Sequence, residues 1–408
     1  MTVSEPGTVL PLFVKALGGS NFLAGLLPSF RYFGWLAPQF LVAGRMQRLT
    51  RFLPITVVLE AVRGSFYLVI AAIVAIYGRD HPGLALAVFF ALFVITRFVA
   101  GCSAVARNEI IARMVPPRDR STVISARRLT GGVAGFLAGF AVRYILDERV
   151  SSFPYNYALL IGFSGLAFGV GIFVLSRVVE PKLPIKPRDI GLLQQLRRAP
   201  GLLKGDRRYA RYVGLQAAAS GLTLAAPFYI LYSAEVLKAP VAMAGIYISI
   251  RTLSRVLSNV FWGNQCKRRS STWVLKSCYA LGMLPPIAVV ILSWATSSVW
   301  SGRAPSFAIW LFGLVFLLQG LAISGHGIGQ LAYLYDISPE RDRPTYYGLS
   351  NTIVGPLYFL PAAGGALLDA FGFVPIFVVA AIFMALASML AIRLDAHDRV
   401  ARALRTTT

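Results

Sequence analysis

Residues 372–392 read GFVPIFVVAAIFMALASMLAI, a run without a charged side chain. A helix that crosses a bilayer needs about 20 mostly apolar residues, so this run is long enough to span one. A shorter apolar run, residues 8–17, ends in a Gly-Gly-Ser turn signal. The sequence therefore predicts an all-α membrane protein, a twelve-helix bundle whose first helix is short. The other spans are predicted at residues 20–44, 53–77, 83–106, 122–146, 155–178, 209–234, 241–263, 273–297, 306–334 and 346–370.

The composition of the chain agrees with this prediction. Of the 408 residues, 56% are hydrophobic and only 14% are charged. A soluble domain carries about 25% charged residues, so a soluble enzyme of this length is excluded. Disordered chains are excluded as well, because they need low hydrophobicity.

The chain is strongly basic, with 40 Lys and Arg against 17 Asp and Glu and a net charge of +23. In a soluble protein this excess would suggest a nucleic-acid partner. Here most basic residues fall on alternate connections between the predicted spans, which is the pattern of cytoplasmic loops in membrane proteins. We therefore expect no nucleic acid, and we place both termini in the cytoplasm. The opposite side receives only Lys15, Arg79, Arg143, Arg149, Lys238 and Arg303.

Two pairs of similar segments indicate an internal repeat. GLLPSFR at residues 25–31 matches GIYISIR at 245–251, and PPRDRST at 116–122 matches PERDRPT at 339–345. Both matches have nearly the same offset and lie at equivalent places in the predicted topology, which is typical of transporters built from two parallel halves. We expect an N-terminal half at residues 1–180, a basic cytoplasmic loop at 181–208, a C-terminal half at 209–393 and a cytoplasmic tail at 394–408.

This organisation resembles the major facilitator superfamily. The loop after the second span, GRMQRLTR at residues 44–51, keeps the basic residues of the family's loop signature but lacks its Asp and its second Gly. The resemblance implies a carrier that works by alternating access, with charged cytoplasmic loops as a gate. The alternative is that these charges are only solvated. The gate residues implied are Arg48, Arg118, Asp119, Arg268, Arg341 and Asp342.

Several ionisable side chains fall inside predicted spans, where a charge is costly unless it is paired or faces water. Arg31 lies about 15 Å along its helix from Asn21, and Arg251 holds the matching position in the second half. Arg255 is one turn from Arg251. With Gln319, these residues are our candidates for binding an anionic substrate, since guanidinium groups bind carboxylates in a bidentate manner. The alternative is a structural network between helices.

Other charges in the spans have different expected roles. Glu60 and Arg63 are spaced i, i+3 and are expected to form a structural pair, whereas Arg97 has no acid near it in sequence. Glu5 lies about 20 Å from Gly18 along the first helix, where a buried acid could carry a proton, or it belongs to a frayed end.

His326, in GHGIG at residues 325–329, is a second proton candidate because histidine titrates near neutrality. Alternatively, it is a packed histidine with a hydrogen-bonded ring. Gln330 lies on the same predicted span. The surrounding glycine run lacks a preceding strand, so it is not a dinucleotide loop.

From these features we expect a secondary active transporter of the plasma membrane, monomeric and driven by a proton gradient, that carries a small organic solute. No ATP-binding motif is present, and we expect neither an enzyme nor a bound metal or cofactor. One alternative is a carrier that exports drugs or lipids, in which the arginines are structural. Another is a membrane receptor or scaffold without transport.

Overall fold

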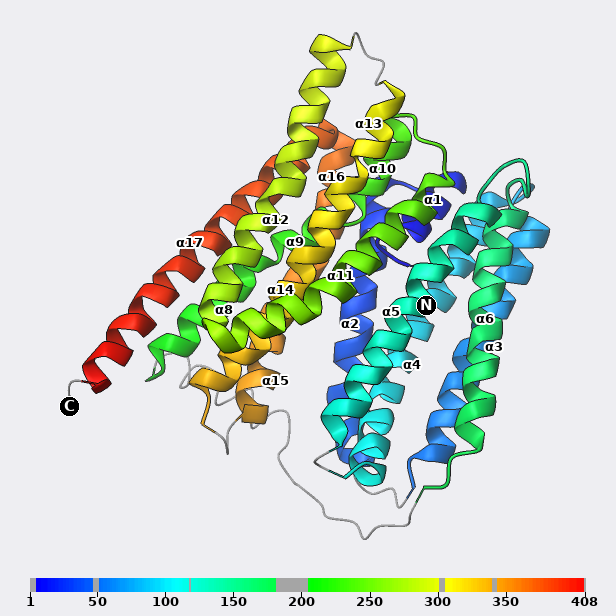
Figure 1. Ribbon diagram of the computed structural model, residues 1–408. Helices are drawn as coiled ribbons and strands as arrows, with labels where there is room; N and C mark the ends of the chain where they lie inside the picture. The colour runs from blue at the N-terminus through cyan, green and yellow to red at the C-terminus, as the bar shows by residue number, and fades with distance from the viewer. Residues whose placement is uncertain are drawn as a thin grey trace. The chain divides into compact units, whose positions relative to one another are not determined.

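The computed structural model describes residues 5–46, 51–116, 119–180, 205–300, 305–339 and 343–406. All regular structure in these ranges is helical, as the sequence predicts. Figure 1 shows helices with similar directions in each half of the chain. The predicted all-α fold is confirmed.

The described residues before 177 form six helices. α1 is short, as expected, and the left-handed backbone of Gly18 (φ +78°) turns the chain from α1 into α2. The remaining helices are close to the predicted spans. The bounds are α1 (Val9–Ala16), α2 (Asn21–Met46), α3 (Leu53–Tyr77), α4 (Pro82–Met114), α5 (Arg120–Ile145) and α6 (Tyr155–Ser176).

The described residues after 204 form helices with more interruptions. Some predicted spans are divided, and the last helix, α17, extends into the predicted tail. The bounds are α8 (Arg207–Ala219), α9 (Gly221–Leu224), α10 (Phe228–Glu235), α11 (Met243–Arg268), α12 (Ser271–Trp294), η1 (Ala295–Val299), α13 (Ser306–Leu311), α14 (Gly313–Ile337), α15 (Arg343–Val354), η2 (Gly355–Phe359), α16 (Leu360–Phe371) and α17 (Phe373–Thr406).

Three spans predicted as single helices are broken, and one of them, the span at 306–334, is divided into α13 and α14. The span at 209–234 is divided into α8, α9 and α10, with Pro227 just before α10. The span at 346–370 contains the 3₁₀ turn η2, which begins at Gly355-Pro356. Proline lacks an N–H group and clashes with the preceding turn, so Pro227 and Pro356 give a local cause for the break before α10 and for η2. When the divided spans are joined, the described residues form twelve helical segments, the number that the sequence predicts.

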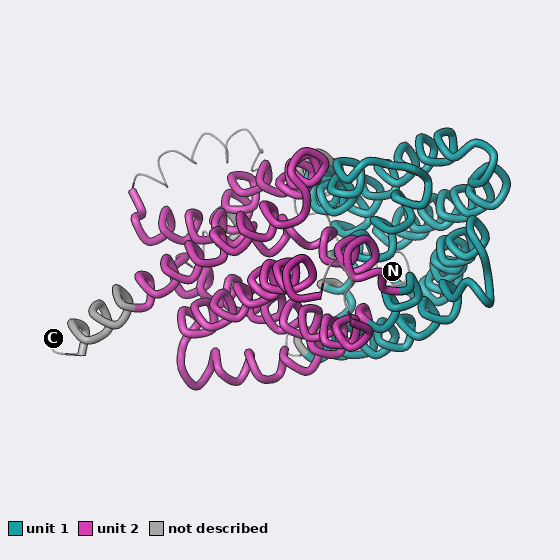
Figure 2. The backbone as a smooth tube through the Cα atoms, turned by 90° about the horizontal axis from the view of Figure 1, so that it is seen from above, with its two compact units in different colours: residues 1–192, 240–246 teal, residues 193–239, 247–408 magenta. Residues whose placement is uncertain are grey.

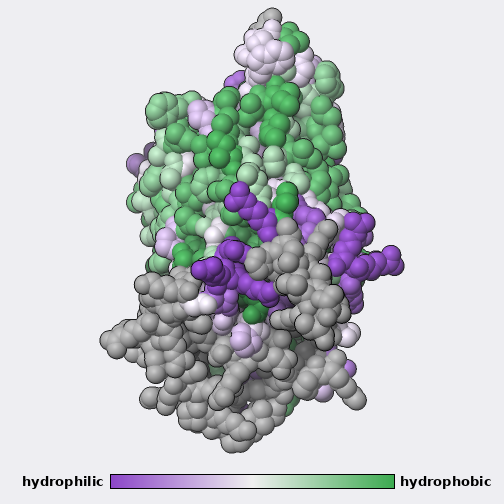
Figure 3. Space-filling model, turned by 90° about the vertical axis from the view of Figure 1, so that its left-hand side faces the viewer, coloured by the Kyte–Doolittle hydropathy of each residue, from purple (hydrophilic) through white to green (hydrophobic). Residues whose placement is uncertain are grey.

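Eight segments in the described residues are long and apolar enough to cross a membrane. Many of their large apolar side chains are exposed, for example Ile76, Val170 and Ile382, each at least 60%. Such a surface is unsuited to water and fits contact with lipid. Figure 3 shows one face on which apolar side chains cover the upper and middle parts and hydrophilic ones gather below.

The chain divides into two compact units, coloured in Figure 2: residues 1–192 with 240–246, and residues 193–239 with 247–408. In unit 1, α3 packs against α4 and α6, and α2 packs against α1 and α4. In unit 2, α12 packs against α14 and α17, and α8 contacts α14, α15 and α17. The predicted limits of the two halves, and the repeat that relates them, stay predictions.

Glycines allow α2 and α4 to approach closely in unit 1. A Cβ atom on Gly34 would lie 2.5 Å from the Cβ of Arg97, and one on Gly101 would lie 2.7 Å from the carbonyl oxygen of Gly34. Contacts this short require glycine. The close approach holds Arg97 directly against α2, the helix that carries Arg31.

A buried carboxylate joins the end of α6 to the start of α3. Glu180, 6% exposed, accepts hydrogen bonds from the backbone N–H groups of Phe52 (2.8 and 2.9 Å) and Leu53 (2.7 Å). These N–H groups lie at a helix start, where no carbonyl of the helix can accept them and a negative charge is favoured.

The Glu180→Ala variant should lose about 2 kcal/mol of stability, since it removes both the cap and the favourable charge. We expect a melting temperature several degrees lower in detergent, whereas Glu148→Ala, at an exposed residue of the same unit, should melt like the parent protein. Equal melting temperatures for the two variants would contradict this role of Glu180.

Candidate functional site

Two residues that the sequence analysis assigned to separate roles contact each other in unit 1. Arg31 of α2 forms an ion pair with Glu5, just before α1. The backbone carbonyl of Glu5 accepts hydrogen bonds from the N–H groups of Thr8 (3.1 Å) and Leu10 (3.3 Å), which hold it at the start of α1. The side chains of Arg31 and Glu5 are 40% and 19% exposed, so the pair is less enclosed by protein than a core ion pair.

A second arginine lies near this pair. Arg97 of α4 is 7% exposed, and one of its terminal nitrogens donates a hydrogen bond to the hydroxyl of Tyr67 on α3. Its guanidinium carbon lies 4.9 Å from the centre of the Phe93 ring. Tyr67 also interacts electrostatically with Arg31. We call Glu5, Arg31, Tyr67 and Arg97 the N-terminal polar centre.

Arg97 is the unusual member of this group. Its Nε atom is buried without a hydrogen-bond partner, and no carboxylate in the described part of the chain pairs with it. A buried cation normally requires a counter-charge, and contacts with aromatic rings compensate only in part. The N-terminal polar centre therefore holds two guanidinium groups and a single carboxylate.

A second arginine buried among the described residues of unit 1, Arg63, differs from Arg97 in having a carboxylate partner, although its Nε atom also lacks a hydrogen-bond partner. Arg63 donates to Glu60 at 2.7 Å, as their i, i+3 spacing predicts, and the two side chains are 2% and 5% exposed. Glu60 also accepts from Arg107 of α4 at 2.6 Å and from the hydroxyl of Ser103. We call these four residues the Glu60 cluster; its burial and pairing fit a structural role.

The predicted substrate residues of unit 2 lie on two neighbouring helices. Arg251 is partly exposed and Arg255 is exposed on α11, whereas Gln319 on α14 is 6% exposed with an unpartnered Nε2 atom. A Cβ atom on Gly320 would lie 2.5 Å from the carbonyl oxygen of Arg251, so the two helices are in close contact there.

The remaining candidates have diverse surroundings. The Nδ1 atom of His326 lies 3.0 Å from the hydroxyl of the buried Tyr279.

Among the predicted gate residues, Asp119, before α5, and Arg268, at the end of α11, are exposed. No group of His, Cys, Asp and Glu within the described ranges could hold a metal ion. The other gate residues lie outside the described residues: Arg48, Arg118, Arg341 and Asp342.

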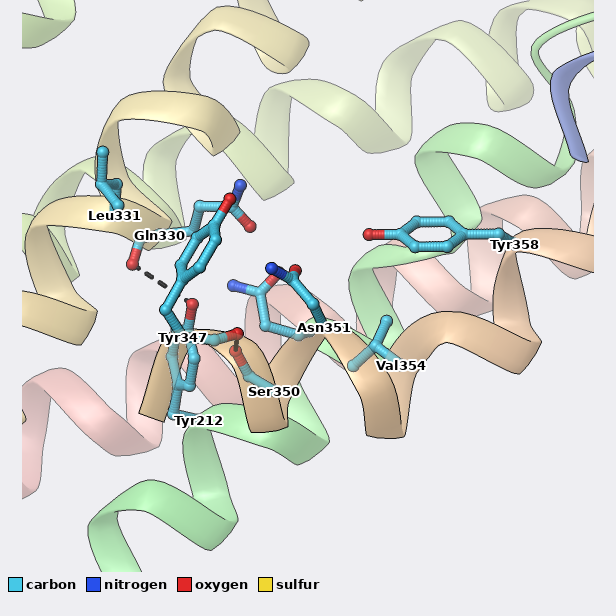
Figure 4. A pocket seen from close by; sticks show the side chains of 9 residues that line it. Tyr212, Gln330, Leu331, Tyr347, Ser350, Asn351, Val354 and Tyr358 are labelled. Carbon is cyan, nitrogen blue, oxygen red and sulfur yellow. Dashed lines mark hydrogen bonds between the residues drawn. The ribbon is translucent and has the colours of Figure 1, made fainter. Parts of the chain in front are cut away.

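Unit 2 contains a hollow that the sequence analysis did not find, although it noted Gln330. It is a partly open hollow between α8, α14, α15 and η2, and the empty space there is about 330 Å³ when the adjoining open solvent is included. We call it the C-terminal hollow, and Figure 4 shows the side chains around it. Its lining residues are Tyr212, Gln216, Gln330, Leu331, Tyr347, Ser350, Asn351, Val354 and Tyr358.

Among the residues that the structure describes, the lining of this hollow is mostly polar and includes no Lys, Arg, Asp, Glu or His. The hydroxyl of Tyr212 donates a hydrogen bond to the backbone carbonyl of Gln330 at 3.3 Å. The hydroxyl of Ser350 donates one to the backbone carbonyl of Tyr347 at 3.0 Å. Gln216 is 8% exposed, and its Nε2 atom has no hydrogen-bond partner. The hollow therefore contains an unused buried donor.

Another polar group, also missed, ties the start of α12 to neighbouring helices. Asp395 of α17 accepts hydrogen bonds from Thr272 (2.7 Å) and Lys276 (2.6 Å) of α12. Asp336 of α14 accepts one from Ser271 at 2.6 Å. These contacts join residues far apart in the sequence, and their geometry fits a structural role.

The fold resembles that of known transporters. The nucleoside transporter NupG is 15% identical with a TM-score of 0.70, and 97% of this chain and 94% of that chain are covered. The xylose transporter XylE from E. coli is 14% identical with a TM-score of 0.66, covering 96% and 94%. A bacterial homologue of the iron transporter ferroportin is 16% identical with a TM-score of 0.64, covering 96% of both chains. At these identities the likeness shows the fold.

The family of the chain follows from its sequence. None of the curated proteins is a match for it. The family model of the Major Facilitator Superfamily matches residues 2–304 and, in a second match, residues 212–406. The resemblance seen in the sequence is thus confirmed, and the chain belongs to the Major Facilitator Superfamily as a multi-pass membrane transporter.

Proposed function

We propose that this transporter is proton-coupled and carries a small anionic organic solute, whose anionic group binds at the N-terminal polar centre. The ion pair of Glu5 and Arg31 is the observation that carries the proposal. With Arg97 beside it, the centre holds more positive than negative charge. An anion that enters a low-dielectric site of this kind finds two guanidinium groups able to bind it.

The ion pair of Glu5 and Arg31 couples the proton to the solute by competition. The proton competes with Arg31 for Glu5, and the solute competes with Glu5 for Arg31. A guanidinium group keeps its proton at all relevant pH values, so a transported proton must reside on Glu5. Protonated Glu5 no longer neutralises Arg31, and Arg31 can then bind the carboxylate of a solute. Solute and proton therefore favour binding of each other, as reciprocal coupling requires.

Exposure distinguishes this pair from the structural one in the same unit. The side chains of Arg31 and Glu5 are 40% and 19% exposed, against 2% and 5% for Arg63 and Glu60. A group that exchanges protons and solute must be reached from water, and of these two pairs the more exposed one supports this role better. In this proposal the termini are cytoplasmic, the carrier is monomeric and it works in the plasma membrane, in line with the distribution of Lys and Arg.

The test uses proteoliposomes that contain the full chain and a pH-sensitive dye. Lactate, benzoate and glucuronate are added in turn, and proton movement is followed by fluorescence. We expect at least one anion to move protons with the parent protein. Glu5→Gln should lose this movement but keep exchange of the labelled anion, because the neutral amide mimics the protonated acid. Arg31→Ala should lose both.

Glu148→Gln, at an exposed residue of the same unit, is the matched control and should behave like the parent protein. Two results would contradict the proposal. One is a Glu5→Gln variant that couples protons normally. The other is a parent protein in which none of the anions moves protons.

A further inference from the structure

We propose that the C-terminal hollow binds an uncharged ligand group that donates and accepts hydrogen bonds and has a flat face, such as a heteroaromatic ring. The hollow lies wholly within unit 2, and its lining comes from α8, α14, α15 and η2. This proposal does not depend on proton coupling by Glu5.

The amide groups of the lining define the hydrogen bonding. Gln216, Gln330 and Asn351 carry carboxamides, and each carboxamide offers two donor hydrogens and one acceptor oxygen. A ligand with both donors and acceptors matches such a set. A charged group leaving water would need a counter-charge, and the described side chains of the lining offer none.

Gln216 shows that the hydrogen bonding of the hollow is incomplete. Its side chain is 92% buried and its Nε2 donor has no partner. Leaving a buried donor unsatisfied destabilises the folded protein, so a ligand acceptor that bonds to this donor would be favoured. Polar groups inside membrane-spanning segments are costly and usually functional, which agrees with this explanation.

The tyrosines define the shape of the ligand group. Tyr212, Tyr347 and Tyr358 come from three different elements around the hollow. In Figure 4, Tyr358 extends from its own side with its hydroxyl toward the other lining side chains. Aromatic rings pack well against other flat rings, and stacking is worth more than the buried area alone. A flat heteroaromatic group uses both the rings and the amides.

Binding is measured on the purified full chain in detergent, by equilibrium dialysis. The probes are uridine and adenosine, which are uncharged and flat; D-xylose, which is uncharged and lacks a flat ring; benzoate, which is flat and anionic; and choline, which is cationic. We expect saturable binding of at least one nucleoside that exceeds binding of xylose and choline, whereas any benzoate bound at the N-terminal polar centre should be unaffected by variants of the hollow. Stronger binding of xylose would contradict the flat face, and stronger binding of choline would contradict the uncharged group.

Variants assign the binding to the hollow. Gln216→Leu and Asn351→Leu should each weaken nucleoside binding by at least about tenfold, the effect of losing one good hydrogen bond. Tyr335→Ala is the matched control for Tyr347→Ala, because the two tyrosines are similarly exposed, at 46% and 43%. Only Tyr347→Ala, which removes a ring of the hollow, should reduce binding. Normal binding by Gln216→Leu and Asn351→Leu would overturn the proposal.

The melting temperature without ligand separates a binding role from a structural one. Because Gln216→Leu removes an unsatisfied donor, the empty variant should melt at the same or a higher temperature than the parent protein. A binding defect accompanied by a lower melting temperature would instead assign Gln216 to the structure of unit 2, and would overturn its role as a ligand group.

The flat group belongs either to the transported solute or to a separate small molecule. Proteoliposomes distinguish these sources. If uridine or adenosine moves protons in the dye assay, and Gln216→Leu abolishes this movement, the group is part of the solute. If a nucleoside binds but moves no protons, it is a separate ligand of the same hollow.

Discussion

Replacing Glu60 by leucine should prevent the protein from accumulating in folded form. Glu60 is 4% exposed and is the carboxylate that pairs with both Arg63 and Arg107. Its loss leaves Arg63, 1% exposed, without this counter-charge. Removing one partner of a buried ion pair typically costs about 3–5 kcal/mol, a large part of the total stability of about 5–15 kcal/mol of a folded protein.

The measurement is the amount of monodisperse protein after solubilisation, followed by size-exclusion chromatography of a fluorescent fusion. Glu109→Leu, at an exposed residue of α4, is the matched control and should leave the yield unchanged. The double variant Glu60→Leu/Arg63→Met should recover part of the yield, because removing both charges is milder than removing one. A normal yield for Glu60→Leu alone would show that the Glu60 cluster does not stabilise unit 1.

The Glu60 cluster shows how far sequence reasoning extends. The pair of Glu60 and Arg63 follows from helical spacing, because residues i and i+3 share a helix face. Ser103 and Arg107 come from another helix, and only the packing of α3 against α4 brings them to Glu60. The contact of Glu5 with Arg31 likewise depends on the turn after α1. Long-range contacts of this kind have no local sequence signal.

The fold was more predictable than the site because a bilayer imposes length and polarity on each span. The helix breaks at Ser220 and at Gly355-Pro356 depend on local backbone effects that hydropathy does not register. The C-terminal hollow did leave a signal. Gln216 follows Tyr212, and Asn351 follows Tyr347, at i, i+4 spacing, so the two members of each pair lie on one face of their helix.

Replacing Arg97 by methionine should abolish transport of an anionic solute while the protein remains at least as stable as the parent. Arg97 is 7% exposed, its Nε atom lacks a partner, and among the described residues it has no carboxylate to pair with. The contacts that offset the burial of its charge are the hydrogen bond to Tyr67 and the cation–π contacts with the rings of Phe93 and Tyr67. Cation–π contacts of buried groups are worth about 2 kcal/mol, less than the desolvation of an ion.

Such a cation lowers stability unless a ligand supplies the missing charge, so its presence favours function over stability. Arg63→Met is the matched comparison, since Arg63 is as deeply buried but has Glu60 as a partner. We expect Arg63→Met to lower the melting temperature and Arg97→Met to preserve or raise it. In the dye assay, Arg97→Met should lose anion-driven proton movement. Arg97→Lys should keep only part of this movement, because lysine lacks the planar guanidinium group that binds a carboxylate through two hydrogen bonds. If Arg97→Met melts lower and still transports, Arg97 stabilises the bundle and the N-terminal polar centre binds its anion through Arg31 alone.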